Sequence, residues 1–160
     1  AADVPAVATL LAQYLQRAAL RPLFITEAEI EHWLLPREGV IHSYVVETEG
    51  GDITDFISFY SLPSTVVSSS SNSLQEERLR VAYLFYYACR DEDRLEQLVR
   101  DALVTARDAG FDVFNCVESL ANRSFFRTLS FQPGDGHLHY YLFNWRTKPL
   151  PCGDVAVTML

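Results

Sequence analysis

The fold is decided by the stretch Leu79 to Cys89, with the sequence LRVAYLFYYAC. Beyond Arg80, every position in it is apolar or aromatic. Successive side chains of a strand point to opposite faces of a sheet. A run that is apolar at both odd and even positions therefore indicates a strand buried on both sides. We predict that this stretch is the central strand of the sheet.

A helix and a second buried strand are predicted directly after this run. Asp93 and Glu96 have the spacing of a capping box, which satisfies free N–H groups at a helix start. Apolar residues then recur at helical spacing until Gly110, a residue type that commonly ends helices. Phe111–Cys116 is typical of a short buried strand. The apolar helix positions are Leu95, Leu98, Val99, Ala102, Leu103 and Ala106.

A β-hairpin is predicted before the central strand. Val40–Thr48 is rich in strand-forming residues, residues 49–52 (EGGD) are typical of a turn, and Ile53–Tyr60 is expected to return as the second arm. Residues 62–65 (LPST) are then expected to leave the sheet. Ser68–Ser73 is polar and of low complexity, and it is expected to be a loop.

Two helices are predicted at the start of the chain. Asp3 can cap the first helix, and Thr26 with Glu29 forms a capping box for the second. Pro36 is expected to end the second helix. The apolar positions are Val7, Leu10, Leu11, Tyr14, Leu15 and Ala18 in the first, and Ile30, Trp33 and Leu34 in the second.

The chain is expected to finish with a helix over Ser119–Leu129 and two strands over His137–Trp145 and Asp154–Leu160. The predicted order is therefore α-α-β-β-β-α-β-α-β-β. A strand–helix–strand unit within a mostly antiparallel sheet predicts an α/β fold in three layers, with a mixed sheet flanked by helices.

Composition excludes several classes of function. The 160 residues carry a net charge of −8, whereas proteins that bind nucleic acid need a basic face. No apolar run is long enough to span a membrane. The three cysteines have no paired spacing, and Cys89 and Cys116 lie in apolar runs, which favours buried, reduced thiols and a cytoplasmic location. The four histidines complete no catalytic or metal-binding set, so no metal site is predicted.

The predicted order resembles the GNAT-like acyl-CoA N-acyltransferase fold. Members of that fold carry a glycine-rich loop after the central strand, where backbone N–H groups hold the pyrophosphate of coenzyme A. The matching stretch here is residues 88–94, with the sequence ACRDEDR. It has no glycine and three carboxylates. The chain is therefore expected to have the fold without the nucleotide site.

Four stretches in order resemble the C-terminal half of the N-myristoyltransferase (glycylpeptide N-tetradecanoyltransferase) family. They are residues 54–65 (TDFISFYSLPST), 82–86 (AYLFY), 110–115 (GFDVFN) and 134–145 (GDGHLHYYLFNW). The resemblance implies that residues 1–160 are a single GNAT-like domain, the peptide-binding half of a monomeric two-half enzyme. Myristoyl-CoA would lie on the N-terminal half, and the ending Met159-Leu160 resembles the type found in protozoan parasites.

The resemblance assigns the general base to the terminal carboxylate, here that of Leu160. The substrate is the N-terminal glycine of a protein, and its α-amine arrives as an ammonium. In water the transfer of its proton to an α-carboxylate is uphill by roughly 6 kcal/mol. Burial raises the pKa of a carboxyl group and lowers that of an ammonium, which narrows the gap. The strand pattern alone leaves open a terminus that merely completes a sheet.

The remaining candidate residues come from the same resemblance and would line the peptide groove. Asp135, in the turn with its neighbour Gly136, would suit a basic side chain of the substrate; a simple tight turn is the alternative. Ser64 could equally be an ordinary turn residue, and Leu79 and Tyr83 could be plain core. The full set of predicted peptide contacts is Ser64, Leu79, Tyr83, Asn115, Asp135, Gly136 and Leu138.

Two rival functions remain open at this point. A GNAT-like module could bind peptides or partner proteins without catalysis, and a stand-alone acyl-CoA transferase is the third possibility. The missing phosphate loop argues against the last. On the favoured interpretation these 160 residues are inactive alone and expose apolar surface where the other half would pack, so they are expected to be poorly soluble in isolation.

Overall fold

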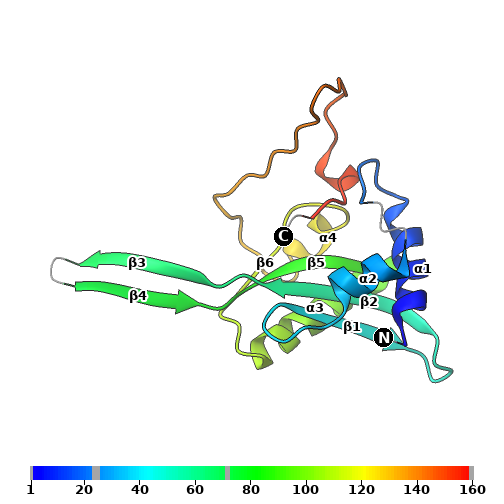
Figure 1. Ribbon diagram of the computed structural model, residues 1–160, viewed down its shortest axis with the longest axis horizontal. Helices are drawn as coiled ribbons and strands as arrows, with labels where there is room; N and C mark the ends of the chain where they lie inside the picture. The colour runs from blue at the N-terminus through cyan, green and yellow to red at the C-terminus, as the bar shows by residue number, and fades with distance from the viewer. Residues whose placement is uncertain (1, 23–25, 71–72, 159–160) are drawn as a thin grey trace.

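A four-stranded mixed sheet lies at the centre of the computed structural model, which describes residues 2–22, 26–70 and 73–158 (Figure 1). Its strands are β1 (Ile41–Glu47), β2 (Ile53–Ser61), β5 (Val81–Cys89) and β6 (Val113–Asn115), in the order β1-β2-β5-β6. β1 pairs with β2 and β2 with β5 in antiparallel fashion, whereas β5 and β6 are parallel. The predicted hairpin and strand–helix–strand unit are confirmed, but β6 is an exposed to half-buried edge strand and not the buried strand predicted over Phe111–Cys116.

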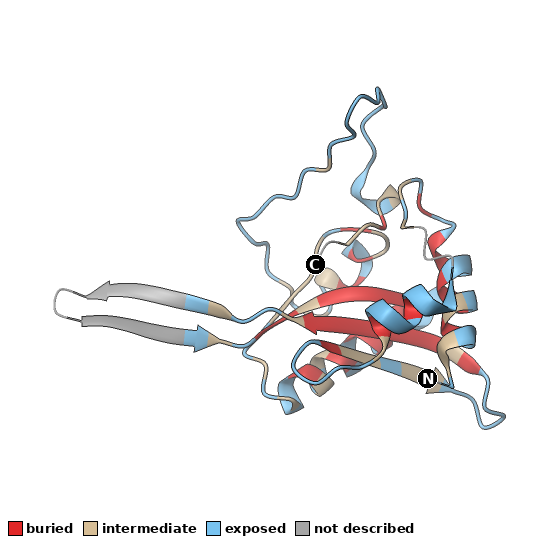
Figure 2. Ribbon diagram, in the orientation of Figure 1, coloured by how far each residue is buried: buried red, intermediate tan, exposed pale blue. Residues whose placement is uncertain are grey.

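Strand β5 is buried along almost its whole length, as predicted (Figure 2). It contains a β-bulge that its sequence pattern does not predict. Ile57 of β2 pairs with Tyr87, but Phe59 pairs with Leu84. Two residues of β5, Phe85 and Tyr86, therefore lie opposite Ser58 alone.

The Ser58 hydroxyl stabilises this bulge. It donates a hydrogen bond to the Tyr86 carbonyl at 2.8 Å and accepts one from the Tyr86 N–H at 3.1 Å. A bulge changes the direction of the side chains beyond it. The Tyr86 ring accordingly lies beside the Phe85 ring, with 4.5 Å between ring centroids, instead of on the opposite face with Leu84.

Helices cover both faces of the sheet. Helices α1 (Val4–Leu15) and α2 (Glu27–Leu34) lie across one face, and α3 (Leu95–Asp108) lies on the other (Figure 1). A helix was predicted over residues 119–129. In the structure only α4 (Arg123–Phe126) is helical there, and most of the other residues of this stretch lie in turns. The buried apolar residues of the helices belong to a single core with those of the sheet, but Trp33, which was predicted on the apolar face of α2, is exposed.

Of the three predicted helix caps, one forms as predicted. Thr26 and Glu29 form the predicted capping box, and α2 ends before Pro36. Asp3 occupies the N-cap of α1 without a side-chain cap bond. The box predicted at Asp93 and Glu96 is wrong. A 3₁₀ turn, η1 (Glu92–Arg94), precedes α3, and the Asp91 carboxylate caps it by accepting the Asp93 N–H.

A long hairpin occupies the region in which residues 62–65 were expected to leave the sheet and residues 68–73 to form a loop, of which Ser71 and Asn72 lie outside the described residues. Strands β3 (Ser64–Ser70) and β4 (Ser73–Leu79) pair from Ser64 with Leu79 outward, and the ribbon projects away from the sheet (Figure 1). Serine-rich composition suggested a loop. The segment also contains Thr65, Val66 and Val67, which are β-branched strand formers, and the partner arm satisfies their backbone groups.

The two strands predicted at the end of the chain are absent from the described residues. Residues 137–145 form no strand, and Phe143 and Asn144 lie in a turn. Of residues 154–160, Val155 makes an isolated parallel bridge with Leu20, after a short 3₁₀ turn, η2 (Cys152–Asp154). An apolar alternating pattern forms a strand when a neighbouring backbone supplies hydrogen bonds, and here the described chain supplies few. Met159 and Leu160 lie outside the described residues.

The described residues also bear on the predictions for membrane spans, metal sites and cysteines. No helix in them is long and apolar enough to cross a membrane, and they contain no group of three His, Cys, Asp or Glu side chains suited to a metal ion. The three cysteines are free thiols. Burial raises the pKa of the Cys89 thiol to about 11 and that of Cys116 to about 12, so both are protonated and unreactive near neutral pH.

Candidate functional site

The last described residues are held firmly against the body of the domain. The Leu20 N–H donates to the Asp154 carbonyl at 3.0 Å, and the Ala156 N–H donates to the Leu20 carbonyl at 2.7 Å. The Leu120 N–H also donates to the Val155 carbonyl at 3.2 Å. Chain ends fray unless such contacts hold them. These hydrogen bonds hold the end of the described chain in place at Asp154, Val155 and Ala156.

Two tyrosine hydroxyls continue the attachment to Thr158. Tyr86 accepts a hydrogen bond from the Thr158 N–H at 3.2 Å and donates one to the Thr158 carbonyl at 3.4 Å. Tyr140 donates a shorter bond, 2.6 Å, to the Val157 carbonyl. These contacts bring together the central strand, the extended segment after α4, and the end of the chain.

Both hydroxyls belong to a group of four tyrosines, Tyr60, Tyr83, Tyr86 and Tyr140, which we call the tyrosine cluster. The rings of Tyr60 and Tyr83 stack with 5.3 Å between centroids. Burial, with a smaller contribution from Tyr140, raises the pKa of the Tyr86 and Tyr60 hydroxyls. The hydroxyls are therefore neutral near pH 7 and available as both donors and acceptors.

Four of the predicted peptide contacts fall into two register pairs near this cluster. Ser64 pairs with Leu79 at the base of the β3–β4 hairpin. Tyr83 pairs with Asn115 across β5 and β6. All four are half-buried, and Tyr83 is itself a member of the tyrosine cluster. Tyr83 thus links the second pair to the tyrosine cluster, while Ser64 and Leu79 lie at the base of the hairpin.

The other predicted contacts lie apart from them. Asp135, Gly136 and Leu138 are exposed on the extended segment that follows α4, drawn in orange in Figure 1. Among the described residues, no hydrogen bond or ion pair joins them to the two register pairs. The segment returns to the chain end through Tyr140. Leu160 falls outside the described residues, so its predicted role stays a prediction.

Sequence analysis missed three members of the tyrosine cluster, namely Tyr60, Tyr86 and Tyr140. Strict alternation along β5 places Tyr86 with Leu84 and away from Tyr83, and the bulge reverses this. The buried Ser58 in an otherwise apolar stretch of β2 was a signal, because a buried hydroxyl needs a hydrogen-bond partner. Nothing in the sequence indicated which residue that partner would be.

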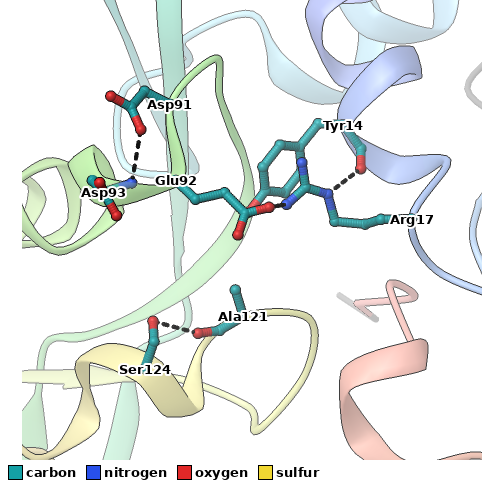
Figure 3. A network of polar contacts seen from close by, with 7 residues as sticks. All are labelled: Tyr14, Arg17, Asp91, Glu92, Asp93, Ala121 and Ser124. Carbon is teal, nitrogen blue, oxygen red and sulfur yellow. Dashed lines mark hydrogen bonds and ion pairs between the residues drawn. The ribbon is translucent and has the colours of Figure 1, made fainter.

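The loop after β5 uses its polar groups internally (Figure 3). Glu92 forms an ion pair with Arg17 of the segment after α1. The Arg17 guanidinium also lies 3.7 Å from the centre of the Tyr14 ring, and the Asp91 carboxylate occupies the Asp93 N–H. A phosphate group would therefore meet acidic side chains and an N–H that already has a partner.

A second ion pair reinforces this end of the sheet. Arg94 contacts the Asp55 carboxylate of β2 at 3.0 Å, and the Thr54 hydroxyl donates to the same oxygen at 2.7 Å. Asp55 is almost completely buried, and its other oxygen has no hydrogen-bond partner among the described residues. The arginine at this loop thus neutralises a buried carboxylate of its own domain.

Comparison with known proteins identifies the family. The model of the family described as myristoyl-CoA:protein N-myristoyltransferase, C-terminal domain, matches residues 1–156. The chain belongs to this family. It is 47% identical over 147 residues to glycylpeptide N-tetradecanoyltransferase 1 of Arabidopsis thaliana, a match that covers 91% of this chain and 32% of that protein. The N-myristoyltransferase resemblance is confirmed; the protozoan type stays a prediction.

Solved structures agree with this family and with its fold. The structure of Saccharomyces cerevisiae N-myristoyltransferase with bound myristoyl-CoA matches with a TM-score of 0.86 and 37% identity, covering 99% of this chain and 44% of that one. A ribosomal-protein-alanine N-acetyltransferase from Brucella melitensis matches with a TM-score of 0.58 at 18% identity, covering 88% of this chain and 92% of that one. The second likeness shows the fold alone, and it confirms the predicted GNAT-like architecture. The chain spans about a third of the length of the curated relatives it matches.

Proposed function

We propose that this chain is the C-terminal, peptide-binding half of an N-myristoyltransferase. The complete enzyme would transfer myristate from myristoyl-CoA to the α-amine of an N-terminal glycine. The observation that carries the proposal is the family match over residues 1–156, which extends nearly to the chain end. The hydrogen bonds that hold Val157 and Thr158 to the tyrosine cluster, which includes the predicted peptide contact Tyr83, support it.

The reaction requires a base. The glycine amine loses a proton and attacks the thioester carbonyl carbon of myristoyl-CoA. A C–N bond forms, the C–S bond breaks, and coenzyme A leaves as a thiolate that takes up a proton. No acyl-enzyme forms, so the protein must align the amine and accept its proton. We assign the second task to the terminal carboxylate of Leu160.

The described structure supports this assignment through position. Thr158 is bonded to Tyr86, and two further residues can extend at most about 7 Å from it. The chain end therefore stays within reach of the tyrosine cluster, which includes the predicted peptide contact Tyr83, and we propose that the carboxylate of Leu160 acts beside it. Partial burial there would raise the pKa of a carboxyl group and bring it closer to that of an amine.

The remaining parts of the reaction fall to other regions. We assign Ser64, Leu79, Tyr83 and Asn115 to the wall of the peptide groove. Asp135, together with Gly136 and Leu138, would contact substrate residues beyond the glycine, where the Asp135 carboxylate suits a basic side chain.

Myristoyl-CoA would be held by the N-terminal half, which is the partner we infer for this chain. The acidic loop after β5, whose polar groups already have partners, supports that division. We infer a monomeric, cytoplasmic enzyme, and we expect these 160 residues to be inactive by themselves.

The test uses the full-length protein, meaning the longer chain of which we propose these residues are the C-terminal part. One glycine is added after Leu160, and transfer of myristate to a glycine-starting peptide is measured. Turnover should fall at least about 100-fold, the usual contribution of a general base, while peptide binding persists. The control is Leu160→Val, which changes the side chain but keeps the terminal carboxylate and should retain turnover.

The outcomes separate the hypotheses. Unchanged turnover after the extension would show that the base lies elsewhere. If the unmodified full-length protein binds peptides but transfers no myristate, the non-catalytic, peptide-binding or partner-binding module becomes the better interpretation.

A further inference from the structure

We propose that Tyr86 and Tyr140 are positioning residues that set the direction in which the chain end leaves Thr158. The inference rests on the proposed function, because the carboxylate they would direct is that of Leu160. Neither tyrosine is expected to touch the reacting atoms. Their effect would pass through the backbone of Val157 and Thr158.

The two hydroxyls hold opposite edges of one peptide group. The Thr158 N–H donates to Tyr86 at 3.2 Å, and the Val157 carbonyl of the same peptide bond accepts from Tyr140 at 2.6 Å. A peptide group is planar and rigid. Two bonds at its opposite edges therefore fix its rotation as well as its position, which a single bond would not do.

The two tyrosines reach this peptide group from independent parts of the domain. Tyr86 belongs to the central strand, and the bulge that Ser58 stabilises directs its ring beside Phe85. Tyr140 belongs to the extended segment that also carries Asp135. Without the bulge, the alternation of β5 would turn Tyr86 to the other face of the sheet.

The rest of the attachment does not duplicate this function. The backbone bonds of Leu20 and Leu120 hold Asp154, Val155 and Ala156, two or more residues further from the end. The chain could still rotate after Ala156. The contacts at Val157 and Thr158 are the last described ones before the carboxylate, so they control its direction most closely.

The consequence for the reaction is a specific kinetic pattern. A displacement of about 1 Å at a reacting group can cost about 100-fold in rate. Loss of either hydroxyl should leave the peptide groove intact, because Ser64, Leu79, Tyr83 and Asn115 do not depend on the bonds to Val157 and Thr158. We therefore expect a lower kcat with little change in KM.

The experiment compares Tyr86→Phe, Tyr140→Phe and the double variant in the full-length protein. Each removes one hydroxyl and keeps the ring. The matched control is Tyr44→Phe on the edge strand β1, where a tyrosine stacks near Phe59 and belongs to neither the cluster nor the predicted groove. Steady-state kinetics give kcat and the KM for peptide and for myristoyl-CoA, and amide hydrogen exchange is followed in the peptide that ends at Leu160.

The single variants should lower kcat about 10- to 100-fold, leave both KM values within about threefold, and accelerate exchange of the C-terminal peptide. Tyr44→Phe should change none of these. Unchanged kcat and unchanged exchange in the variants would overturn the inference, as would a rise in KM at constant kcat. If the unmodified protein transfers no myristate, the proposed function fails, while the exchange measurement still decides whether the two tyrosines hold the chain end.

Discussion

Because its partner carboxylate, Asp55, is buried, Arg94 is expected to contribute more to stability than its own exposure suggests. Arg94 and Arg100 have equally exposed side chains, 48% in each case, and each forms one 3.0 Å ion pair. The partners differ, because Asp55 is 1% exposed and Glu96 is 41% exposed. Removing one member of a buried pair leaves an uncompensated charge, whereas exposed pairs contribute about 0–1 kcal/mol.

We therefore predict that Arg94→Met lowers the free energy of unfolding by about 3 kcal/mol and that Arg100→Met lowers it by less than about 1 kcal/mol. The measurement is urea denaturation of the full-length protein carrying each change. Equal losses in the two variants would show that the burial of Asp55 adds nothing to the value of its ion pair.

His42 gives the domain a defined sensitivity to acid. Its ring stacks on Phe59 with 4.9 Å between centroids, and burial, followed by the nearby Arg80, lowers its pKa from the usual value. The unfolded chain therefore binds a proton at higher pH than the folded one. Stability from the neutral ring is complete above about pH 6.5 and is lost as the pH falls toward the lowered folded-state pKa.

The variant His42→Phe keeps an aromatic ring and removes this titration. Between pH 7 and pH 5, its thermal midpoint in the full-length protein should fall less than that of the unmodified protein. The same fall in both proteins would assign the acid sensitivity to other groups.

The bulge in β5 depends on one hydroxyl, and the chain offers a matched comparison. Ser58 bonds both backbone groups of Tyr86, whereas the buried Oγ of Ser43 on β1 has no hydrogen-bond partner within the described ranges. Ser58→Ala leaves buried N–H and C=O groups unpaired and should cost about 1–3 kcal/mol. Ser43→Ala removes an unpaired polar atom and should be neutral or stabilising.

Urea denaturation of the two full-length variants tests this contrast. Since the bulge also directs Tyr86, Ser58→Ala should accelerate hydrogen exchange at the C-terminal peptide, and Ser43→Ala should not. A loss of stability in Ser43→Ala that matches the loss in Ser58→Ala would contradict the structural role given to Ser58.

Elements whose stability is local, or whose burial is complete, could be predicted from the sequence. The capping box of Thr26 and Glu29, the amphipathic pattern of α3 and the two-sided apolar run of β5 each carry their own physical signal. The bulge at Phe85 and Tyr86 could not be predicted, because it depends on which residue of β2 lies opposite. The β3–β4 hairpin was missed because its serines suggested a loop more strongly than its β-branched residues suggested strands.

Some residues of the candidate site could be predicted from the sequence and others could not. Ser64, Leu79, Tyr83 and Asn115 could be nominated from family resemblance, and the register of the strands pairs Ser64 with Leu79 and Tyr83 with Asn115. Tyr86 and Tyr140 could not be nominated, since the positions they bond, Val157 and Thr158, were expected in a regular strand. That strand does not form along the described residues because the backbone of Leu20 pairs with Val155 at a single position. No neighbouring strand of the described residues continues this pairing.

One segment of the described domain exposes large aromatic side chains to solvent. The segment after α4 exposes Tyr141, Phe143 and Trp145 at 87%, 93% and 73% of their surfaces. Large aromatic side chains in a continuous exposed stretch are typical of a surface that another protein segment covers. The acidic loop after β5 presents carboxylates and an N–H that already has a partner, so both features favour a chain that functions beside a cofactor-binding half.

This view predicts that Phe143 contributes to stability in the full-length protein as a core residue would. Phe143→Ala should cost about 3 kcal/mol, although its side chain is 93% exposed in the present structure. The control is Val104→Ala on α3, also exposed, which should change stability by less than about 0.5 kcal/mol. Both are measured by urea denaturation. A cost for Phe143→Ala as small as that of the control would mean that the aromatic segment stays exposed to solvent in the full-length protein, and the proposed N-terminal half would then have to pack elsewhere.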